Sequence, residues 1–172
     1  MESRLQANIV SYANHYVICC KGDVDEALAE MYRMMRRLKL TVNEAKTRVC
    51  HWPEERFDFL GYSFGRYYSP QTGRAYLCAW PSMKSVRRLI GAIREATERR
   101  VLRLEADEMV QQINRRLLGW ANFFSLGPTG KAYRVIDRYT PRRQYRWYAR
   151  KIRGTIPERP GSRTITSTTR WA

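Results

Sequence analysis

The sequence predicts an α+β fold, in which strands and one helix are followed by a helical domain. Up to residue 81, short apolar stretches alternate with turn residues, whereas from residue 82 apolar residues recur at helical spacing. From residue 154 the chain is rich in Thr, Ser, Pro, Arg and Gly and poor in apolar residues. We therefore expect an α+β segment at 1–81, a helical domain at 82–153, and a basic tail at 154–172 that is extended along a partner or disordered when alone.

The first predicted elements are a β-hairpin and an amphipathic helix. Apolar residues at 8–10 and 16–19 flank Ala13-Asn14-His15, and asparagine readily adopts the left-handed conformation of tight turns. Asp23 then offers an N-cap, and the helix is marked by the apolar residues Val24, Ala27, Leu28, Met31, Met35 and Leu38. We interpret Asp23 and Asp25 as capping and helix-dipole residues rather than as displaced metal ligands.

Three strands are expected next, at 48–51, 57–64 and 75–80, with a turn at 70–73. The helical domain then begins at Ser82, which is a residue type suited to an N-cap. Its first helix is marked by Val86, Leu89, Ile90 and Ile93. Its second helix, which ends before Gly127-Pro128, is marked by Met109, Val110, Ile113, Leu117 and Trp120.

Two further helices are predicted on either side of a proline. The first is marked by Ala132, Val135, Ile136 and Tyr139. Pro141 is expected to break or restart the helix, because proline fits the first turn of a helix and not its interior. Residues 141–153 are therefore interpreted as a fourth helix.

The excess of basic residues is confined to the second half of the chain. The formal net charge is +16; residues 1–83 hold 11 Lys and Arg against 9 Asp and Glu, whereas residues 84–172 hold 21 against 7. Such one-sided charge favours a polyanionic partner, either nucleic acid or an acidic membrane surface. There is no run of about eighteen apolar residues and no signal-peptide pattern, so we expect a cytoplasmic protein that does not enter the membrane.

The four cysteines, at positions 19, 20, 50 and 78, show no spacing typical of a metal site. Adjacent Cys19 and Cys20 do not easily form a disulfide with each other, so reduced thiols are expected. Cys50-His51 has no second ligand cluster. We therefore predict that the protein itself binds no metal and no cofactor.

Four motifs occur in the order found in one protein family. They are Tyr12-Ala13 in the hairpin, Asn43-Glu44-Ala45-Lys46-Thr47, Phe59-Leu60-Gly61-Tyr62, and the segment 112–124 (QINRRLLGWANFF) with Asp137-Arg138-Tyr139 after it. Over residues 7–153 the chain thereby resembles the group II intron reverse transcriptase/maturases. The resemblance implies part of a reverse-transcriptase palm, with a small antiparallel sheet and a helix, followed by the maturase-specific thumb, domain X.

The hairpin departs from the family pattern at the residues that would support polymerase chemistry. Asn14 and His15 replace both aspartates, Lys39 stands where the family often has glycine, and the earlier palm aspartate would lie before Met1 with the fingers. Mg²⁺ prefers anionic oxygen ligands, which an amide and an imidazole do not supply. We therefore expect no catalytic residues and no polymerase activity, and we interpret His15 as a turn residue rather than a general base. Without a zinc endonuclease module after the thumb, target-DNA cleavage is not expected either.

The resemblance implies a non-enzymatic maturase whose partner is group II intron RNA. Binding the folded intron in preference to misfolded states would stabilise the splicing-competent fold by linkage, and the RNA, with its own Mg²⁺, would remain the catalyst. Two alternatives stay open: a subunit of a split reverse transcriptase, and a general basic RNA-binding or chaperone protein. The number of copies on the RNA also stays open.

The candidate RNA-binding residues lie in the thumb-like region. Residues 109–172 hold 14 Lys and Arg against 2 Asp and Glu, and the planar guanidinium of arginine binds a phosphate bidentately or stacks on a base. The spacing of Arg142, Arg146, Arg150 and Arg153 aligns them on one helix surface. Tyr145, Trp147 and Tyr148 are either core residues or stacking platforms. The full candidate set is Arg115, Arg116, Lys131, Arg134, Arg138, Arg142, Arg143, Arg146, Arg150, Lys151 and Arg153.

Overall fold

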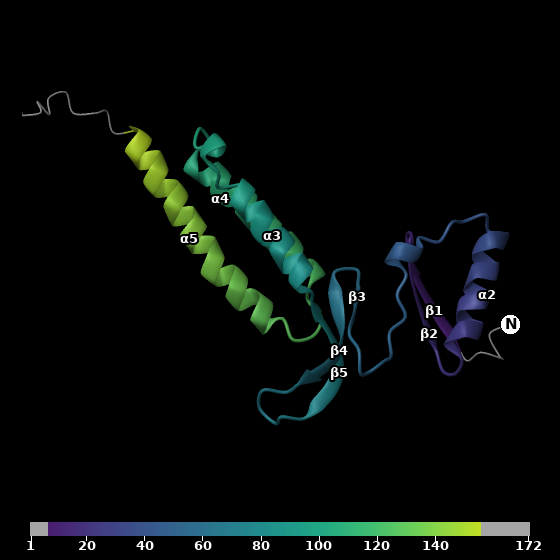
Figure 1. Ribbon diagram of the computed structural model, residues 1–172. Helices are drawn as coiled ribbons and strands as arrows, with labels where there is room; N and C mark the ends of the chain where they lie inside the picture. The colour runs from purple at the N-terminus through teal and green to yellow at the C-terminus, as the bar shows by residue number, and fades with distance from the viewer. Residues whose placement is uncertain (1–6, 156–172) are drawn as a thin grey trace, which may run out of the picture. The chain divides into compact units, whose positions relative to one another are not determined.

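Residues 7–155 are described by a computed structural model, and their fold is α+β, as the sequence predicts (Figure 1). The regular structure of these residues comprises two small antiparallel sheets, four α-helices, and two short 3₁₀ helices at Glu44–Lys46 and Arg99–Val101. The chain divides into two compact units between Cys78 and Ala79. Of the predicted tail, residues 156–172 lie outside the described residues.

The first unit begins with the predicted β-hairpin. Strand β1 (Ala7–Tyr12) pairs antiparallel with β2 (His15–Cys20), and Tyr12 lies opposite His15. The sequence predicts the left-handed residue of this two-residue turn at Asn14. In the structure it is Ala13 that has a positive φ, of 51°. His15 directly follows these two residues, so it is both the last residue of the four-residue turn and the first residue of β2.

Helix α2 (Val24–Arg37) follows the hairpin and begins at the predicted N-cap. The Asp23 carboxylate accepts a hydrogen bond from the Asp25 N–H at 2.9 Å, which is the geometry of a capping residue. At the other end, the N–H groups of Lys39 and Leu40 bond to carbonyls of the last helical turn, and Lys39 has a φ of 55°. Glycine is favoured in this left-handed position, so the presence of Lys39 is a departure from the usual residue type at such a helix end.

The predicted strand at 57–64 is in fact a hairpin. Strand β3 (Phe57–Phe59) pairs antiparallel with β4 (Tyr62–Tyr68). Between them Leu60 and Gly61 have φ values of 51° and 84°. Two consecutive positive φ angles reverse the chain within two residues, as in a type I′ turn. The apolar run of this segment therefore belongs to two short strands instead of one.

Residues 48–51 form no strand, which corrects a second prediction. The backbone of His51 is engaged locally: its N–H donates to the Glu55 carboxylate at 3.0 Å, and its carbonyl accepts from the Glu55 N–H at 2.7 Å. The predicted turn at 70–73 is present and leads into β5 (Ala75–Pro81), which lies beside β4 in the second sheet.

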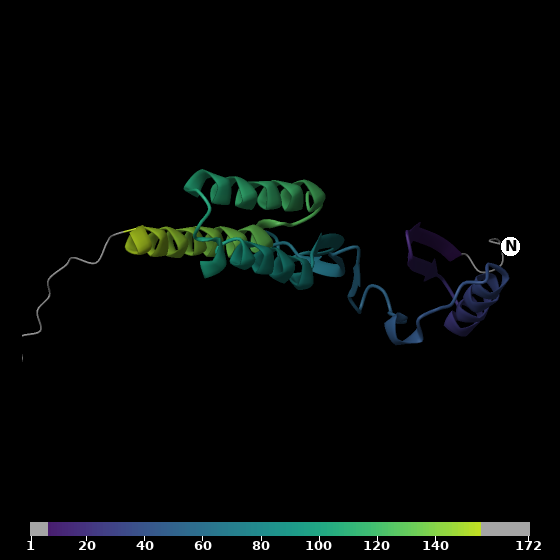
Figure 2. The same cartoon turned by 90° about the horizontal axis from the view of Figure 1, so that it is seen from above.

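The second unit is a bundle of α3 (Met83–Glu95), α4 (Ala106–Phe123) and α5 (Gly130–Thr155) (Figures 1 and 2). Ser82 caps α3 as predicted, because its hydroxyl accepts from the Ser85 N–H at 3.2 Å. Helices α3 and α5 lie side by side, and Figure 2 shows α4 against them on one side.

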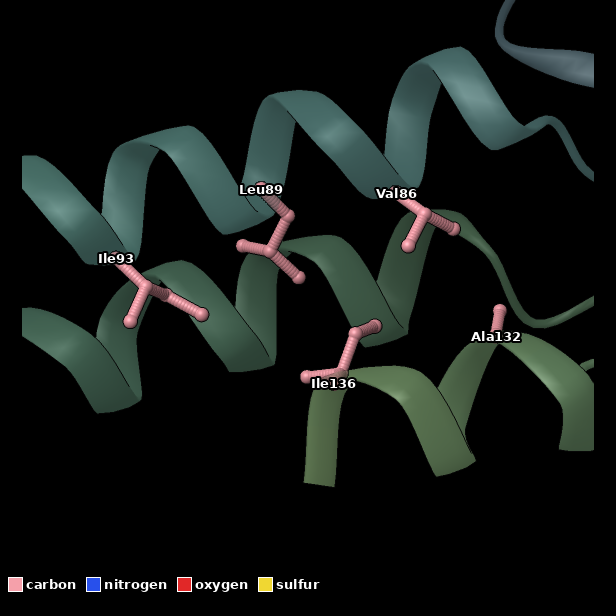
Figure 3. Close-up of a cluster of buried hydrophobic side chains, with 5 residues drawn as sticks. All are labelled: Val86, Leu89, Ile93, Ala132 and Ile136. Atoms are coloured by element: carbon pink, nitrogen blue, oxygen red, sulfur yellow. The ribbon is translucent and has the colours of Figure 1, made fainter. Parts of the chain in front are cut away.

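Two apolar clusters form the core of this bundle. The first joins α3 to α5, and Figure 3 shows its side chains pointing toward one another; it consists of Val86, Leu89, Ile93, Ala132 and Ile136. The second joins α4 to the later part of α5 and consists of Ala96, Met109, Ile113 and Trp147. Most of these residues belong to the apolar patterns that predicted the helices.

Helix α5 continues through Pro141, so the predicted break at this residue is wrong. A proline inside a helix gives no N–H to the carbonyl four residues earlier and costs about 3 kcal/mol. Packing on both sides of the proline offsets this cost, because Ile136 is buried in the first cluster and Trp147 in the second. The helix includes the whole predicted segment 141–153 and is described as far as Thr155.

Candidate nucleic-acid interface

Helix α5 has one buried face and one strongly basic face. Ala132, Ile136, Thr140 and Trp147 are buried in the bundle. The opposite side carries seven exposed cationic residues, which we call the cationic row: Lys131, Arg134, Arg138, Arg142, Arg146, Arg150 and Arg153. Asp137 is the one acidic residue of the helix. The row therefore presents nearly unopposed positive charge to its surroundings.

Most arginines of the cationic row are available to an external anion. Within residues 7–155, the structure shows no hydrogen bond or ion pair for five of them, Arg138, Arg142, Arg146, Arg150 and Arg153. Arg134 donates from Nε to the Gly130 carbonyl at 3.3 Å, within its own helix. Arg115 is likewise exposed on α4. These guanidinium groups have donors free for phosphate oxygens.

Arg143 is also a predicted RNA-binding residue, but it is engaged inside the bundle. Its Nε donates to the Thr97 hydroxyl at 2.9 Å, and its Nη2 donates to the carbonyls of Arg94 and Thr97 at 3.1 and 3.2 Å. These carbonyls lie at the C-terminal end of α3, where a positive charge also complements the helix dipole. Arg143 thus fastens α5 to the end of α3.

Two other candidate cations make comparable contacts between helices. Lys151 Nζ donates to the Leu104 carbonyl, lies 3.5 Å from the Glu105 carboxylate, and lies 5.4 Å from the centre of the Trp147 ring. Arg116 donates from Nη1 to the Ala92 carbonyl at 2.6 Å and so ties α4 to α3. Of the eleven candidates, seven therefore form the cationic row, Arg115 is exposed on α4, and three connect helices of the bundle: Arg116, Arg143 and Lys151.

Tyr145, Trp147 and Tyr148, which the sequence predicts as either core residues or stacking platforms, lie in different environments. Trp147 is fully buried in the second cluster, and Tyr148 packs against it with ring centroids 5.4 Å apart. Tyr145 is 75% exposed. The first two are core residues, whereas Tyr145 lies on the side of the cationic row.

A second basic surface on α3 was missed by the sequence interpretation. Its exposed residues are Lys84, Arg87, Arg88 and Arg94, with Glu95 as the one acidic residue among the helix's exposed positions. The sequence contains a pattern that predicts this surface, because the basic positions lie between the apolar residues Val86, Leu89 and Ile93, which are buried. The predicted candidates began at residue 115, so this helix was treated only as a core element.

The β1–β2 hairpin exposes both residues that stand in place of the family's aspartates. Asn14 and His15 are exposed at its turn, and residues 7–20 include no Asp or Glu. Over the described part of the chain, no group of three or more His, Cys, Asp or Glu side chains is placed to hold a metal ion. The four cysteines are free, and burial raises the pKa of the Cys78 thiol, which favours its protonated form.

The helical bundle lies in a region of the chain that matches a known domain family. Residues 86–160 match the family model of the group II intron, maturase-specific domain. This match includes α3 from Val86 onward and all of α4 and α5. The resemblance to the maturase thumb is thereby supported for this region, while the palm assignment of the first unit stays a prediction. No curated protein matches the chain.

The maturase-specific domain indicates a function related to group II introns and their splicing, and it implies interaction with intron RNA. The domain alone is not catalytic. None of the helices within residues 7–155 has the length and apolar character needed to cross a membrane.

Proposed function

We propose that this protein is a group II intron maturase that binds intron RNA and stabilises its splicing-competent fold, without reverse transcriptase or endonuclease activity. The cationic row of α5 is the observation that supports this proposal most directly. It places exposed arginines along one helix of the maturase-specific domain, and most of them have donors free for phosphate. A-form RNA hides its base edges in a deep, narrow groove, so a protein that binds a large folded RNA contacts mainly phosphates, hydroxyls and exposed loops.

Stabilisation of the intron follows from differential binding. A protein that binds the folded RNA more tightly than its misfolded forms shifts the population toward the folded form by the difference in binding free energy. No chemical step by a protein residue is needed. The RNA and its own Mg²⁺ perform the splicing reactions, and the protein acts as a folding cofactor.

The absence of carboxylates from the hairpin tip favours this function over polymerase activity. A polymerase palm holds Mg²⁺ with carboxylates, whereas the exposed tip of the β1–β2 hairpin offers the amide of Asn14 and the imidazole of His15. We therefore expect no primer extension by the purified protein on an RNA template. Incorporation of dNTPs that is abolished by changing Asn14 or His15 would favour the split reverse transcriptase instead.

The cationic row can be tested by removing three of its members. The triple variant R142A/R146A/R150A should weaken intron binding and reduce the salt dependence of log Kd by roughly 0.7–0.9 for each phosphate that the protein no longer neutralises. A matched control, R37A/R66A/R74A, removes the same charge from exposed positions of the first unit. Equal effects of the two variants would mean that only net charge matters and would contradict an interface on α5.

Specificity for an intron separates a maturase from a general RNA chaperone. Nonspecific phosphate binding weakens steeply as salt is raised, whereas contacts with a specific fold persist. At raised salt we expect tighter binding to a group II intron than to an unrelated structured RNA of the same length, and faster splicing at low Mg²⁺ with the protein than without it. Equal affinities and equal splicing rates would favour the chaperone.

A further inference from the structure

Among the described residues of the bundle, Tyr145 has the most exposed large apolar or aromatic side chain. Its exposed fraction is 75%, whereas Trp147, two residues later on the same helix, is fully buried. Within residues 7–155 the structure shows no ring contact, cation–π contact or hydrogen bond for Tyr145. Its aromatic ring therefore contributes little to the core of the bundle.

The surroundings of Tyr145 differ from those of an ordinary exposed tyrosine. Arg142 lies one helical turn before it and Arg146 directly after it, and both guanidinium groups are exposed and have no partner among the described residues. One turn further along the helix stands Ala149, whose small side chain leaves the ring uncovered on that side. The ring thus lies within the cationic row.

We propose that Tyr145 stacks on an unpaired base of the bound RNA, while Arg142 and Arg146 bind the neighbouring phosphates. This inference rests on the function proposed above and specifies the RNA element that α5 recognises, which is a loop or bulge rather than a continuous duplex. In an A-form helix both faces of each base are covered by its neighbours, so an aromatic side chain reaches a base face only where the stack is interrupted. The positive charge on both sides of the ring favours RNA over an apolar protein surface.

The test uses the full chain and two RNAs, a continuous duplex and the same duplex interrupted by an unpaired adenosine loop that contains one 2-aminopurine. Wild-type protein should bind the interrupted duplex more tightly and quench its 2-aminopurine fluorescence. Y145A should bind the interrupted duplex roughly 5- to 100-fold more weakly, with loss of the quenching, because stacking contributes about that factor per base. Its affinity for the continuous duplex and its salt dependence should stay as in wild type.

Two control variants separate stacking from loss of surface. Y145F keeps the ring and should behave like wild type on both RNAs. I152A removes a 59% exposed apolar side chain from the same helix and should also have no effect. Helical circular dichroism of each variant should match wild type, since neither side chain is buried.

Three outcomes would overturn the inference. They are equal decreases in affinity for both RNAs in Y145A, no decrease for either, and an I152A effect as large as that of Y145A. If the wild-type protein binds neither RNA, the stacking inference fails, and if it binds polyglutamate as tightly as RNA, the proposed function fails as well. RNA binding that responds to the triple arginine variant but not to Y145A would overturn the stacking role alone.

Discussion

At the scale of single residues, neighbouring arginines of α5 have different tasks. Arg142 is exposed and without a partner among the described residues, whereas Arg143 donates to Arg94 and Thr97 at the end of α3. The sequence predicted both as RNA-binding residues because both belong to the same basic run. It could not separate them, since the partners of Arg143 lie 46 and 49 positions earlier in the chain.

This difference predicts opposite phenotypes for two adjacent substitutions. Arg143→Ala removes the donor from the part-buried carbonyl and hydroxyl oxygens of Thr97 and should lower the free energy of unfolding by about 1–3 kcal/mol. Arg142→Ala should change stability by less than about 0.5 kcal/mol but reduce the salt dependence of RNA binding. Chemical denaturation and salt titration of both variants measure the two effects. Similar decreases in stability in the two variants would contradict the fastening role of Arg143.

At the scale of secondary-structure elements, the sequence predicted correctly where local signals determine the structure. The N-caps Asp23 and Ser82 lie within a few residues of the groups that they bond, and both begin the predicted helices. Errors arose where the local signal was overridden or absent. Pro141 is held inside α5 by packing against other helices, and a leucine adopts the positive φ at position 60 that is more typical of glycine or asparagine.

The loop between α4 and α5 contains a glycine that no other residue can replace without strain. Gly127 has a φ of +71°, and a Cβ built there would lie 1.8 Å from the backbone oxygen of Ala79. This separation is far inside van der Waals distance, so the loop or the end of β5 would have to move. The backbone of the loop at Gly127 therefore packs directly against that of Ala79 in β5, shortly before α3.

Substitution of this glycine gives a test at the same scale. Gly127→Ala should destabilise the second unit by about 2 kcal/mol or more, because it combines the positive φ with a backbone clash. Gly91→Ala is the matched control, since Gly91 lies inside α3 with nothing within 4 Å of its added Cβ. This control should stabilise the helix by roughly 0.5–1 kcal/mol. Thermal unfolding that shifts in the same direction for both variants would contradict the close approach.

At the scale of the whole molecule, the chain combines two units of different character. The net charge of residues 84–172 is +14, with 21 basic and 7 acidic residues, whereas that of residues 1–83 is +2, with 11 basic and 9 acidic residues. The sequence therefore predicts that an anion binds to the second half, and the family match lies within that half. The sequence could not indicate which cations fasten helices together, because those roles depend on how the bundle packs.

Binding of RNA should stabilise this protein measurably. A ligand at 100 times its Kd that binds only the folded state adds about 2.7 kcal/mol. We expect the melting temperature, followed by helical circular dichroism, to rise with group II intron RNA at low salt and to rise less as salt is added. The same concentration of the triple variant R142A/R146A/R150A should show a smaller rise. Equal melting temperatures with and without RNA would count against a ribonucleoprotein.

Because α5 continues through Pro141, the helix fixes the distances between the charged residues at its two ends. At a rise of 1.5 Å per residue, Lys131 and Arg153 are separated by about 33 Å measured along the helix. A hinge at the proline would let the two ends adapt to partners of many shapes. A continuous helix instead fixes the separation of its charges in advance, so under the proposed function it would favour phosphates that are already arranged at that spacing.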